Sequence, residues 1–313
     1  MNNLPNDQFN TNYAGEIDLS DMLNALWEKK YSISLIIFIF VLSSIFYAVN
    51  QPNIYKSEAI LIPVESDTGM GGMLGEYSGM AALAGISLPD DASSKSKEAI
   101  ARIKSYDFFS EQLLPYIKLE DIFAVKKWDA TSNKNIYDER IFDTKSRKWV
   151  RKVRSPRSTI PSSQEAYEEY IDILTISQDK ITSFVSLSIE HESPYLAQRW
   201  VRLIIDQIDK VMRNEARNEA TKSVEYLNSL RPTVNYDEIR DAISSLQQEE
   251  MKRLMMVEAN ENYIFKVIDS PLIPEIKFKP KRSLIVMLGL ILGIIISVLS
   301  FLIPYFRKIS DAE

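Results

Sequence analysis

The sequence predicts an α+β membrane protein, in which two transmembrane helices flank a mixed α/β base domain with a long projecting helical arm. Three observations predict this class. Two long apolar runs lie near the two ends of the chain, strand-like segments adjoin them, and one helical pattern of unusual length lies between. The chain has 313 residues, 45% of them hydrophobic, which is enough for a core in addition to the spans.

The two apolar runs cover residues 33–49 and 283–306, and neither contains a charged residue. A helix needs about 20 residues, at about 1.5 Å each, to cross the hydrocarbon core of a bilayer. The second run is long enough and the first is near the lower limit, so we expect transmembrane helices over 32–50 and 283–306. A polar, partly acidic segment precedes the first run, which favours an uncleaved anchor over a signal peptide.

Two spans place both ends of the chain, residues 1–31 and 307–313, on one side of the membrane. The domain 51–282 then lies on the other side. Basic residues outside the two spans favour a cytoplasmic location for the ends, whereas the basic residues just before the second span argue for the opposite orientation. Charge alone therefore leaves both orientations open, with cytoplasmic ends preferred. The absence of cysteine excludes disulfides, thiolate nucleophiles and thiolate metal sites.

Between the spans, hydrophobic periodicity predicts both strands and helices. A strand follows the first span almost at once and another immediately precedes the proline-rich segment before the second, so we expect these two strands to pair. Ser193 and Pro194 have the residue types of a helix N-cap and first position, and Pro232 ends or kinks the helix that they begin. The expected strands are 54–64, 171–178, 182–190 and 263–269, and the expected helices are 95–114, 194–231 and 235–260.

The middle of the long helix, MRNEARNEATKS, is polar nearly all round. A helix of this kind needs neighbours or ion pairs to persist. We therefore expect it to project from the base and to be flanked by copies of itself.

Two further segments allow a structural and a functional interpretation. Residues 136–157 contain an acidic part followed by a basic part, which predicts a hairpin turning at 143–146 with opposite charges across the strands, or a patch for an anionic saccharide or lipid. Six of the nine glycines fall between Gly69 and Gly85 without a phosphate-binding pattern, which favours a flexible loop or a small-residue lining.

The segment SPLIPEIKFKPKRS, residues 270–283, leads directly into the second apolar run. Its prolines stop strand and helix alike and favour a stiff, extended backbone. Its cations are placed where phosphate headgroups begin. The segment is either a stiff joint anchored at the headgroups or a site that touches another membrane protein or a lipid-linked substrate. The residues concerned are Pro271, Pro274, Lys277, Lys279, Pro280, Lys281 and Arg282.

Within the second run, Gly289 and Gly293 form a G-x-x-x-G pair. Such pairs allow two helices to approach closely. They predict packing of one span against another.

No pattern in the sequence indicates catalysis. His191 is the only histidine and is expected at the surface or at a helix cap, and no metalloprotease or nucleophile-elbow motif occurs. We expect no enzyme activity, no cofactor, no metal and no nucleic acid. A sensor is the second class considered, but the short segments outside the spans leave little room for an output domain.

Several segments in order resemble the Wzz family, the chain-length determinants of bacterial surface polysaccharides, which are polysaccharide co-polymerases of the first class. These segments are EIDLSDMLNALWEKK, NIYKSEAILIPVE, the Gly-Met-Ala-rich loop, LSIEHESPYLAQRWV with its long helix, and EANENYIFKVIDSPLIPE. The family's proline-rich motif corresponds to Pro271, Pro274, Pro280, Lys281 and Arg282. Where the family often has a further proline, this chain has Ser283.

The resemblance implies an inner-membrane protein with cytoplasmic ends, a periplasmic domain and a ring-like homo-oligomer. It implies a non-catalytic role beside a Wzy-type polymerase, setting how many repeat units are added to an undecaprenyl-diphosphate-linked O-antigen or similar glycan. Membrane lipids are further expected partners. The alternatives are a component required for exopolysaccharide or capsule export and, with less support, a periplasmic sensor or adaptor.

Overall fold

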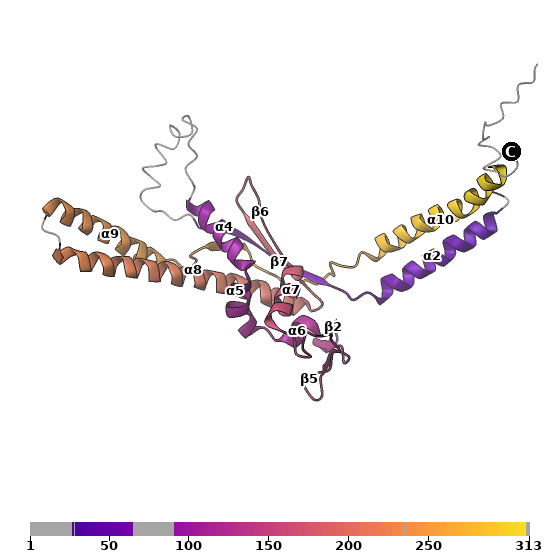
Figure 1. Ribbon diagram of the computed structural model, residues 1–313, viewed down its shortest axis with the longest axis horizontal. Helices are drawn as coiled ribbons and strands as arrows, with labels where there is room; N and C mark the ends of the chain where they lie inside the picture. The colour runs from indigo at the N-terminus through magenta and orange to yellow at the C-terminus, as the bar shows by residue number, and fades with distance from the viewer. Residues whose placement is uncertain (1–26, 28, 65–90, 234–235, 311–313) are drawn as a thin grey trace, which may run out of the picture. The chain divides into compact units, whose positions relative to one another are not determined.

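The computed structural model describes residues 27, 29–64, 91–233 and 236–310, and the chain divides into two compact units. One unit contains helices α2 (Lys30–Asn50) and α10 (Arg282–Ser310), which lie side by side (Figure 1). The other covers Pro52–Lys279 and has a mixed α/β structure. Most of the N-terminal segment and the glycine-rich stretch 69–85 lie outside the described residues.

A four-stranded antiparallel sheet forms the centre of the larger unit, in the order β6-β7-β1-β8. The expected pairing of the first and last strands is confirmed, since Leu61 of β1 lies opposite Val267 of β8. Burial alternates along β1 as the pleat requires, with Ala59 and Leu61 both inaccessible to solvent. The strands are β1 (Tyr55–Pro63), β6 (Leu174–Gln178), β7 (Val185–His191) and β8 (Phe265–Asp269).

The expected strand 171–178 is wrong in its first part, because helix α7 (Ser163–Ile173) extends to the start of β6. A capping box begins this helix: the Ser162 hydroxyl accepts the backbone N–H of Glu165 at 3.2 Å, and the Glu165 carboxylate accepts the N–H of Ser162. The S-x-x-E pattern of residues 162–165 could have predicted the start of this helix.

The expected strand 182–190 begins three residues late, at Val185. The Asp179 carboxylate accepts the backbone N–H groups of Ile181 and Thr182 at 2.8 and 2.7 Å, which holds a loop in place of ladder pairing.

The expected helix 95–114 is interrupted. Helix α4 (Asp91–Ile103) ends before Ser105, whose hydroxyl donates to the carbonyl of Arg102 and accepts the N–H of Phe108. A serine that satisfies backbone groups on both sides competes with a continuous helix. The chain continues as α5 (Tyr106–Phe108), a π-helical turn (Phe109–Leu113), a 3₁₀ turn (Leu114–Tyr116) and α6 (Leu119–Phe123).

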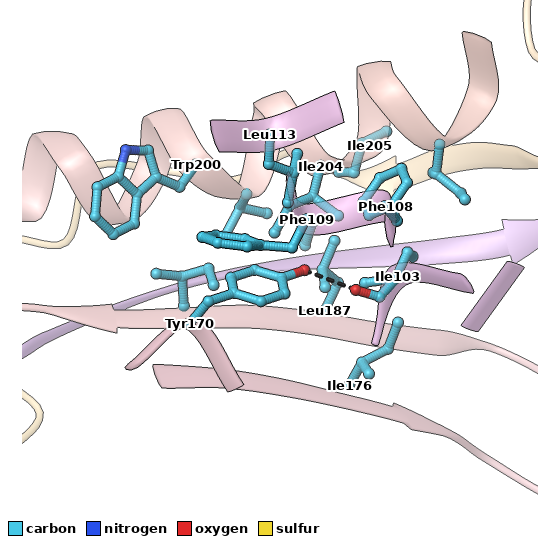
Figure 2. Close-up of a cluster of buried hydrophobic side chains, with 14 of the residues drawn as sticks. Ile103, Phe108, Phe109, Leu113, Tyr170, Ile176, Leu187, Trp200, Ile204 and Ile205 are labelled. Atoms are coloured by element: carbon cyan, nitrogen blue, oxygen red, sulfur yellow. Dashed lines mark hydrogen bonds between the residues drawn. The ribbon is translucent and has the colours of Figure 1, made fainter. Parts of the chain in front are cut away.

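The core lies between the sheet and helix α8 (Pro194–Leu230), as Figure 2 shows. Phe109 is fully buried between them and stacks on Tyr170 with ring centroids 4.8 Å apart. The Tyr170 hydroxyl donates to the carbonyl of Ile103 at 2.9 Å, and burial raises the pKa of this phenol. The interrupted segment therefore supplies the aromatic layer that joins α8 to the sheet.

Beyond the sheet, α8 pairs with helix α9 (Asp237–Ala259), which returns antiparallel beside it (Figure 1). Pro232 lies in the 3₁₀ turn Arg231–Thr233 that ends α8. Ion pairs connect the two helices, Arg217 with Glu258 at 2.5 Å and Arg253 with Glu219 at 2.7 Å. The polar part of α8 thus has a neighbour within its own chain. Flanking by other copies remains a prediction.

One residue pair on α8 fixes the point where α9 ends and β8 begins. Arg213 donates to the Asp209 carboxylate at 2.8 Å and to the carbonyl oxygens of Val257, Asn260 and Glu261. The second oxygen of Asp209 accepts the N–H groups of Tyr263 and Ile264 at 2.6 and 3.1 Å. We call this arrangement the Asp209–Arg213 clamp. It binds backbone groups of five residues at the junction of the two elements, and it directs the chain into β8.

Two short hairpins complete the unit: β2 (Val125–Asp129) with β3 (Lys134–Tyr137), and β4 (Phe142–Asp143) with β5 (Lys148–Trp149). The expected turn at 143–146 is present, since the Asp143 carboxylate accepts the N–H of Lys145 at 2.9 Å. Asp143 also lies opposite Lys148. The hairpin is much shorter than the expected one, however, because β3 pairs with β2 instead.

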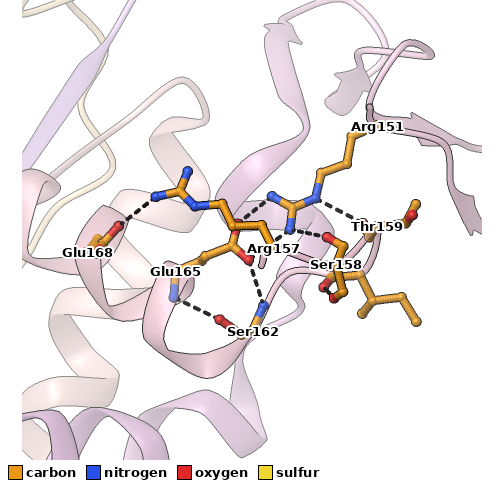
Figure 3. A network of polar contacts seen from close by, with 8 residues as sticks. Arg151, Arg157, Ser158, Thr159, Ser162, Glu165 and Glu168 are labelled. Carbon is orange, nitrogen blue, oxygen red and sulfur yellow. Dashed lines mark hydrogen bonds and ion pairs between the residues drawn. The ribbon is translucent and has the colours of Figure 1, made fainter. Parts of the chain in front are cut away.

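Arg151, one of the basic residues of that segment, pairs outside the hairpin (Figure 3). Its guanidinium donates to both oxygens of Glu165, at 2.7 and 3.0 Å, and to the carbonyl oxygens of Ser158 and Thr159. Only 13% of the Arg151 side chain and 10% of the Glu165 side chain are exposed, so the pair is shielded from water. Hydrogen bonds from Arg151 lower the pKa of Glu165 below its ordinary value.

The lowered pKa gives a pH-dependent prediction. The ordinary pKa of glutamate is 4.5, so this carboxylate contributes its full stabilisation above that pH and loses it as the pH falls through the lowered value. Replacing Glu165 by Gln should reduce the free energy of unfolding by about 2 kcal/mol at neutral pH, and by much less near about pH 3. Thermal unfolding across this pH range measures the difference.

The matched control is Glu168→Gln, because the partner of Glu168, Arg157, lies 3.5 Å away and both side chains are more than half exposed. A pH-independent gap between wild type and Glu165→Gln would contradict the assignment.

Candidate functional site

The proline-rich segment is held on the larger unit by its backbone. The Ser57 hydroxyl of β1 donates to the carbonyl of Leu272 at 2.7 Å, and the Gln198 amide of α8 donates to the carbonyl of Pro271 at 3.2 Å. Ile54 exchanges backbone hydrogen bonds with Lys279, at 3.0 and 3.2 Å. Residues 270–279 therefore lie along the start of β1, so that the two ends of this unit are adjacent.

The side chains of the segment divide into buried and exposed groups. Pro271 is buried and Pro274 and Lys277 are half-buried. Apolar side chains project outward between them, with Leu272 71% and Ile276 82% exposed. A segment that is hydrogen-bonded near both ends and carries exposed apolar side chains can contact another surface.

The charge of Lys279, which we expected to face phosphate headgroups, is paired within the larger unit. Its ammonium group forms an ion pair with Glu190 of β7 at 2.6 Å and lies 5.4 Å from the centroid of the Phe278 ring. Lys56 of β1 lies 5.5 Å from the same ring. Lys279 therefore stabilises the docking of the segment on the sheet.

The remaining motif residues, Pro280, Lys281 and Arg282, belong to the unit of the two apolar helices. Arg282 begins α10, and its Nε donates to the carbonyl of Ala48 near the end of α2 at 3.1 Å. Lys281 is exposed. Both helices are long and apolar enough to cross a membrane, with mean hydropathies of 2.5 for α2 and 2.9 for α10.

Gly289 and Gly293 face α2 at very short range. A Cβ atom at Gly289 would lie 2.5 Å from the Cβ of Ser44, and one at Gly293 would lie 3.1 Å from the Cβ of Phe40. Ser297 continues this row at the same spacing and is fully buried. The row of small residues allows the two helix backbones to approach more closely than a side chain would permit.

His191 is buried, contrary to the expected surface location, and its cap role takes an unexpected form. Its Nδ1 accepts the backbone N–H of Ser193 at 2.9 Å, so its Nε2 carries the proton and donates to the carbonyl of Asp121 at 2.8 Å. Ser193 occupies the N-cap position of α8 as expected, but its hydroxyl does not cap the helix. His191 thus positions the first turn of α8.

The sequence did not identify the residues that support the motif. Ser57, Glu190 and Gln198 are separated from it by long stretches of chain, and no local pattern marks them. Ser297 could have been recognised, because it extends the glycine spacing by four residues. Among the described residues, no three His, Asp or Glu side chains come together as a metal site would require.

Comparison with known proteins finds a family match for the N-terminal part of the chain. Residues 15–113 match the family described as Wzz, chain length determinant protein. This part of the chain is therefore similar to the Wzz chain length determinants. The matched residues include the whole of α2 and β1 and the segment through the π-helical turn. No curated protein matches the chain.

Two solved structures resemble the chain at low similarity. One is a full-length bacterial polysaccharide co-polymerase, 14% identical, with a TM-score of 0.40, covering 95% of this chain and 100% of that one. The other is a fragment of WzzB, a polysaccharide co-polymerase from Salmonella Typhimurium, also 14% identical, with a TM-score of 0.29, covering 72% of this chain and 100% of that one.

The close approach of the two helices gives a prediction for Gly289. Replacing it by Ile places a side chain where Ser44 already lies, so α2 and α10 must separate, at a cost of about 1–3 kcal/mol. The chain has no native cysteine, so spin labels attached at Ser34→Cys and Ser300→Cys report the helix separation without background. The distance distribution should shift to longer values and broaden.

The control is Leu290→Ile, at a neighbouring position that is 41% exposed. It should leave the distribution as in the parent. An unchanged distribution in Gly289→Ile would show that the glycine is not required for the packing.

Proposed function

We propose that the protein regulates the chain length of a bacterial surface polysaccharide as a non-catalytic component of the inner membrane. Its two apolar helices span the membrane, both ends of the chain lie in the cytoplasm, and residues 51–282 form a periplasmic co-polymerase domain. The proposed partners are further copies of the chain in a ring, a Wzy-type polymerase and its undecaprenyl-diphosphate-linked glycan.

The match of residues 15–113 to the Wzz chain length determinants is the observation that carries this proposal. The rest of the chain is consistent with it. The two helices are packed through a row of small residues, and the motif before α10 is docked on the sheet with exposed apolar side chains. Because this exposed segment directly precedes an apolar helix in the sequence, we take it as a contact for another membrane protein.

In this mechanism the protein does no chemistry on the glycan. The α8–α9 hairpin is the proposed projecting arm, and the base and arms of neighbouring copies pack against one another. The docked segment 270–279 presents one surface of each copy to the polymerase. The geometry of the assembly then biases the number of repeat units at which the growing chain is released.

The direct test is a glycan ladder. Deleting the gene in its host should replace a modal cluster of bands by a graded ladder weighted to short chains, and adding the gene back should restore the mode. Loss of all polymer would instead indicate a role in polysaccharide export. An unchanged ladder in a strain without a second such gene would contradict length control.

A double variant tests the motif. Changing Pro274 and Pro280 to Ala loosens the backbone without removing a hydrogen bond, because proline has no N–H. The protein should keep its fold and its thermal midpoint, while the modal length shifts or broadens. The control is Pro161→Ala, a proline far from the motif in the sequence. A ladder identical to that of the wild type would exclude a role of these two prolines in length control.

A further inference from the structure

A small cavity of about 240 Å³ lies between the β2–β3 hairpin and the first turn of α8. It is smaller than the roughly 300–1,000 Å³ typical of sites for drug-sized ligands. Because a water occupies about 30 Å³, the cavity has room for several waters, and a ligand group the size of one ring could replace them. Its lining combines aromatic, amide and hydroxyl groups and contains no charged side chain. The lining residues are Trp128, Asn133, Asn135, Ser193, Tyr195 and Leu196.

One wall is an aromatic platform. The Trp128 ring lies 5.9 Å from that of Tyr195 and 5.8 Å from that of Tyr55, which it meets at 87°. The indole N–H donates to the side-chain oxygen of Asn133 at 3.0 Å. Asn135 lies directly opposite Trp128 on the neighbouring strand, so both side chains are on one face of the hairpin.

The tip of this hairpin is fixed by its own hydrogen bonds. The Asp129 carboxylate accepts the N–H of Thr131 at 3.1 Å and the hydroxyl of Ser132 at 2.7 Å, and these bonds lower the pKa of Asp129. Asn133 has a φ of 50°, a left-handed conformation that asparagine tolerates better than most residues. The amide of Asn133 is therefore held in place beside the indole.

Asp121 of α6 joins the two walls. Its carboxylate accepts the hydroxyl of Tyr137, two residues after Asn135 on the same strand, at 2.7 Å. Its backbone carbonyl accepts the Nε2 proton of His191, the residue that positions the first turn of α8. Burial, followed by the Asp121 hydrogen bond, raises the pKa of Tyr137, so the phenol keeps the proton that it donates. Both walls are thus tied to one residue, and the cavity between them is preorganised.

Ser193 contributes a polar group to the cavity that makes no capping hydrogen bond. It is only 2% exposed, it lines the cavity, and its hydroxyl does not cap α8 although it occupies the N-cap position. Serine at this position normally accepts a backbone N–H of the first turn. The first turn therefore presents a serine hydroxyl and N–H groups that no side chain caps, next to Tyr195, which is 42% exposed.

We propose that this cavity binds one pyranose ring of a polysaccharide. An aromatic face suits the apolar C–H face of a sugar ring, while amide, hydroxyl and backbone N–H groups at fixed positions suit its hydroxyls. The absence of charge in the lining disfavours phosphates and charged peptides, which need a compensating partner when they leave water. The choice of a glycan as ligand rests on the proposed function and adds to it a contact point on the periplasmic unit.

The test measures binding of oligosaccharides to the full chain in lipid nanodiscs, because detergents with sugar headgroups would compete. The probes are fragments of one to three repeat units, released from the host's own surface polysaccharide and freed of lipid. Saturation-transfer NMR identifies the ring in contact, and calorimetry gives the affinity. Wild type should bind. Tyr195→Ala should weaken binding by about fivefold or more through loss of the aromatic face, and Ser193→Ala by about threefold or more.

Two variants on the same helix serve as controls. Tyr226→Ala removes an aromatic side chain that is 64% exposed, and Ser229→Ala removes a hydroxyl that donates to the carbonyl of Tyr226 at 2.7 Å. Both should bind as wild type does. The hydroxyl that Ser193→Ala removes does not cap α8, so we expect this variant to fold as wild type does. Misfolding would then not account for weaker binding by Ser193→Ala.

The outcomes separate this proposal from the proposed function. No binding by wild type, or equal binding by wild type, Tyr195→Ala and Ser193→Ala, overturns the cavity as a sugar site even if gene deletion abolishes the modal length. Binding that is weakened in both cavity variants and unchanged in both controls supports the site, even if gene deletion leaves the ladder unchanged and thereby contradicts length control.

Discussion

The Asp209–Arg213 clamp is the constraint on which the arrangement of the larger unit depends. Helix α8 carries the chain away from the sheet and α9 brings it back, so the sheet is complete only if the returning chain enters β8 in register with β1. Arg213 and Asp209 satisfy backbone groups from Val257 to Ile264, where the chain leaves one element and begins another. Both side chains are about four-fifths buried, which strengthens their charge-assisted hydrogen bonds.

The position of β8 determines where the proline-rich segment lies. Because β8 lies beside β1, the segment 270–279 returns to the start of β1 and is fixed there through Ile54 and Ser57. The proposed sugar cavity shares this end of the unit, since Tyr55 of its platform is the neighbour of Ile54. A glycan contact and the proposed polymerase-facing segment would thus be supported by the same strand.

Local patterns in the sequence predicted those elements that depend on local interactions. The strand that follows the first apolar helix, the long helix from Pro194 and its end near Pro232 follow from periodicity and proline chemistry, whereas the direction in which the chain continues after Pro232 does not. The interruption at Ser105 and the helix before β6 depended on side-chain capping, which the serine and glutamate positions could have indicated. The clamp, the docking of Lys279 on Glu190 and the bridge through Asp121 join residues far apart in the chain, and no local pattern encodes them.

Hydrogen exchange of the full chain in nanodiscs tests the central role of the clamp most directly. Arg213→Ala leaves one oxygen of Asp209 and three backbone carbonyls without their Arg213 partner, and it should raise amide exchange throughout 260–279. Arg217→Ala is the control, since it removes a more exposed ion pair from the same helix. Faster exchange of 260–279 in Arg213→Ala alone is the predicted result. Protection of this segment equal to that of the wild type would contradict the account.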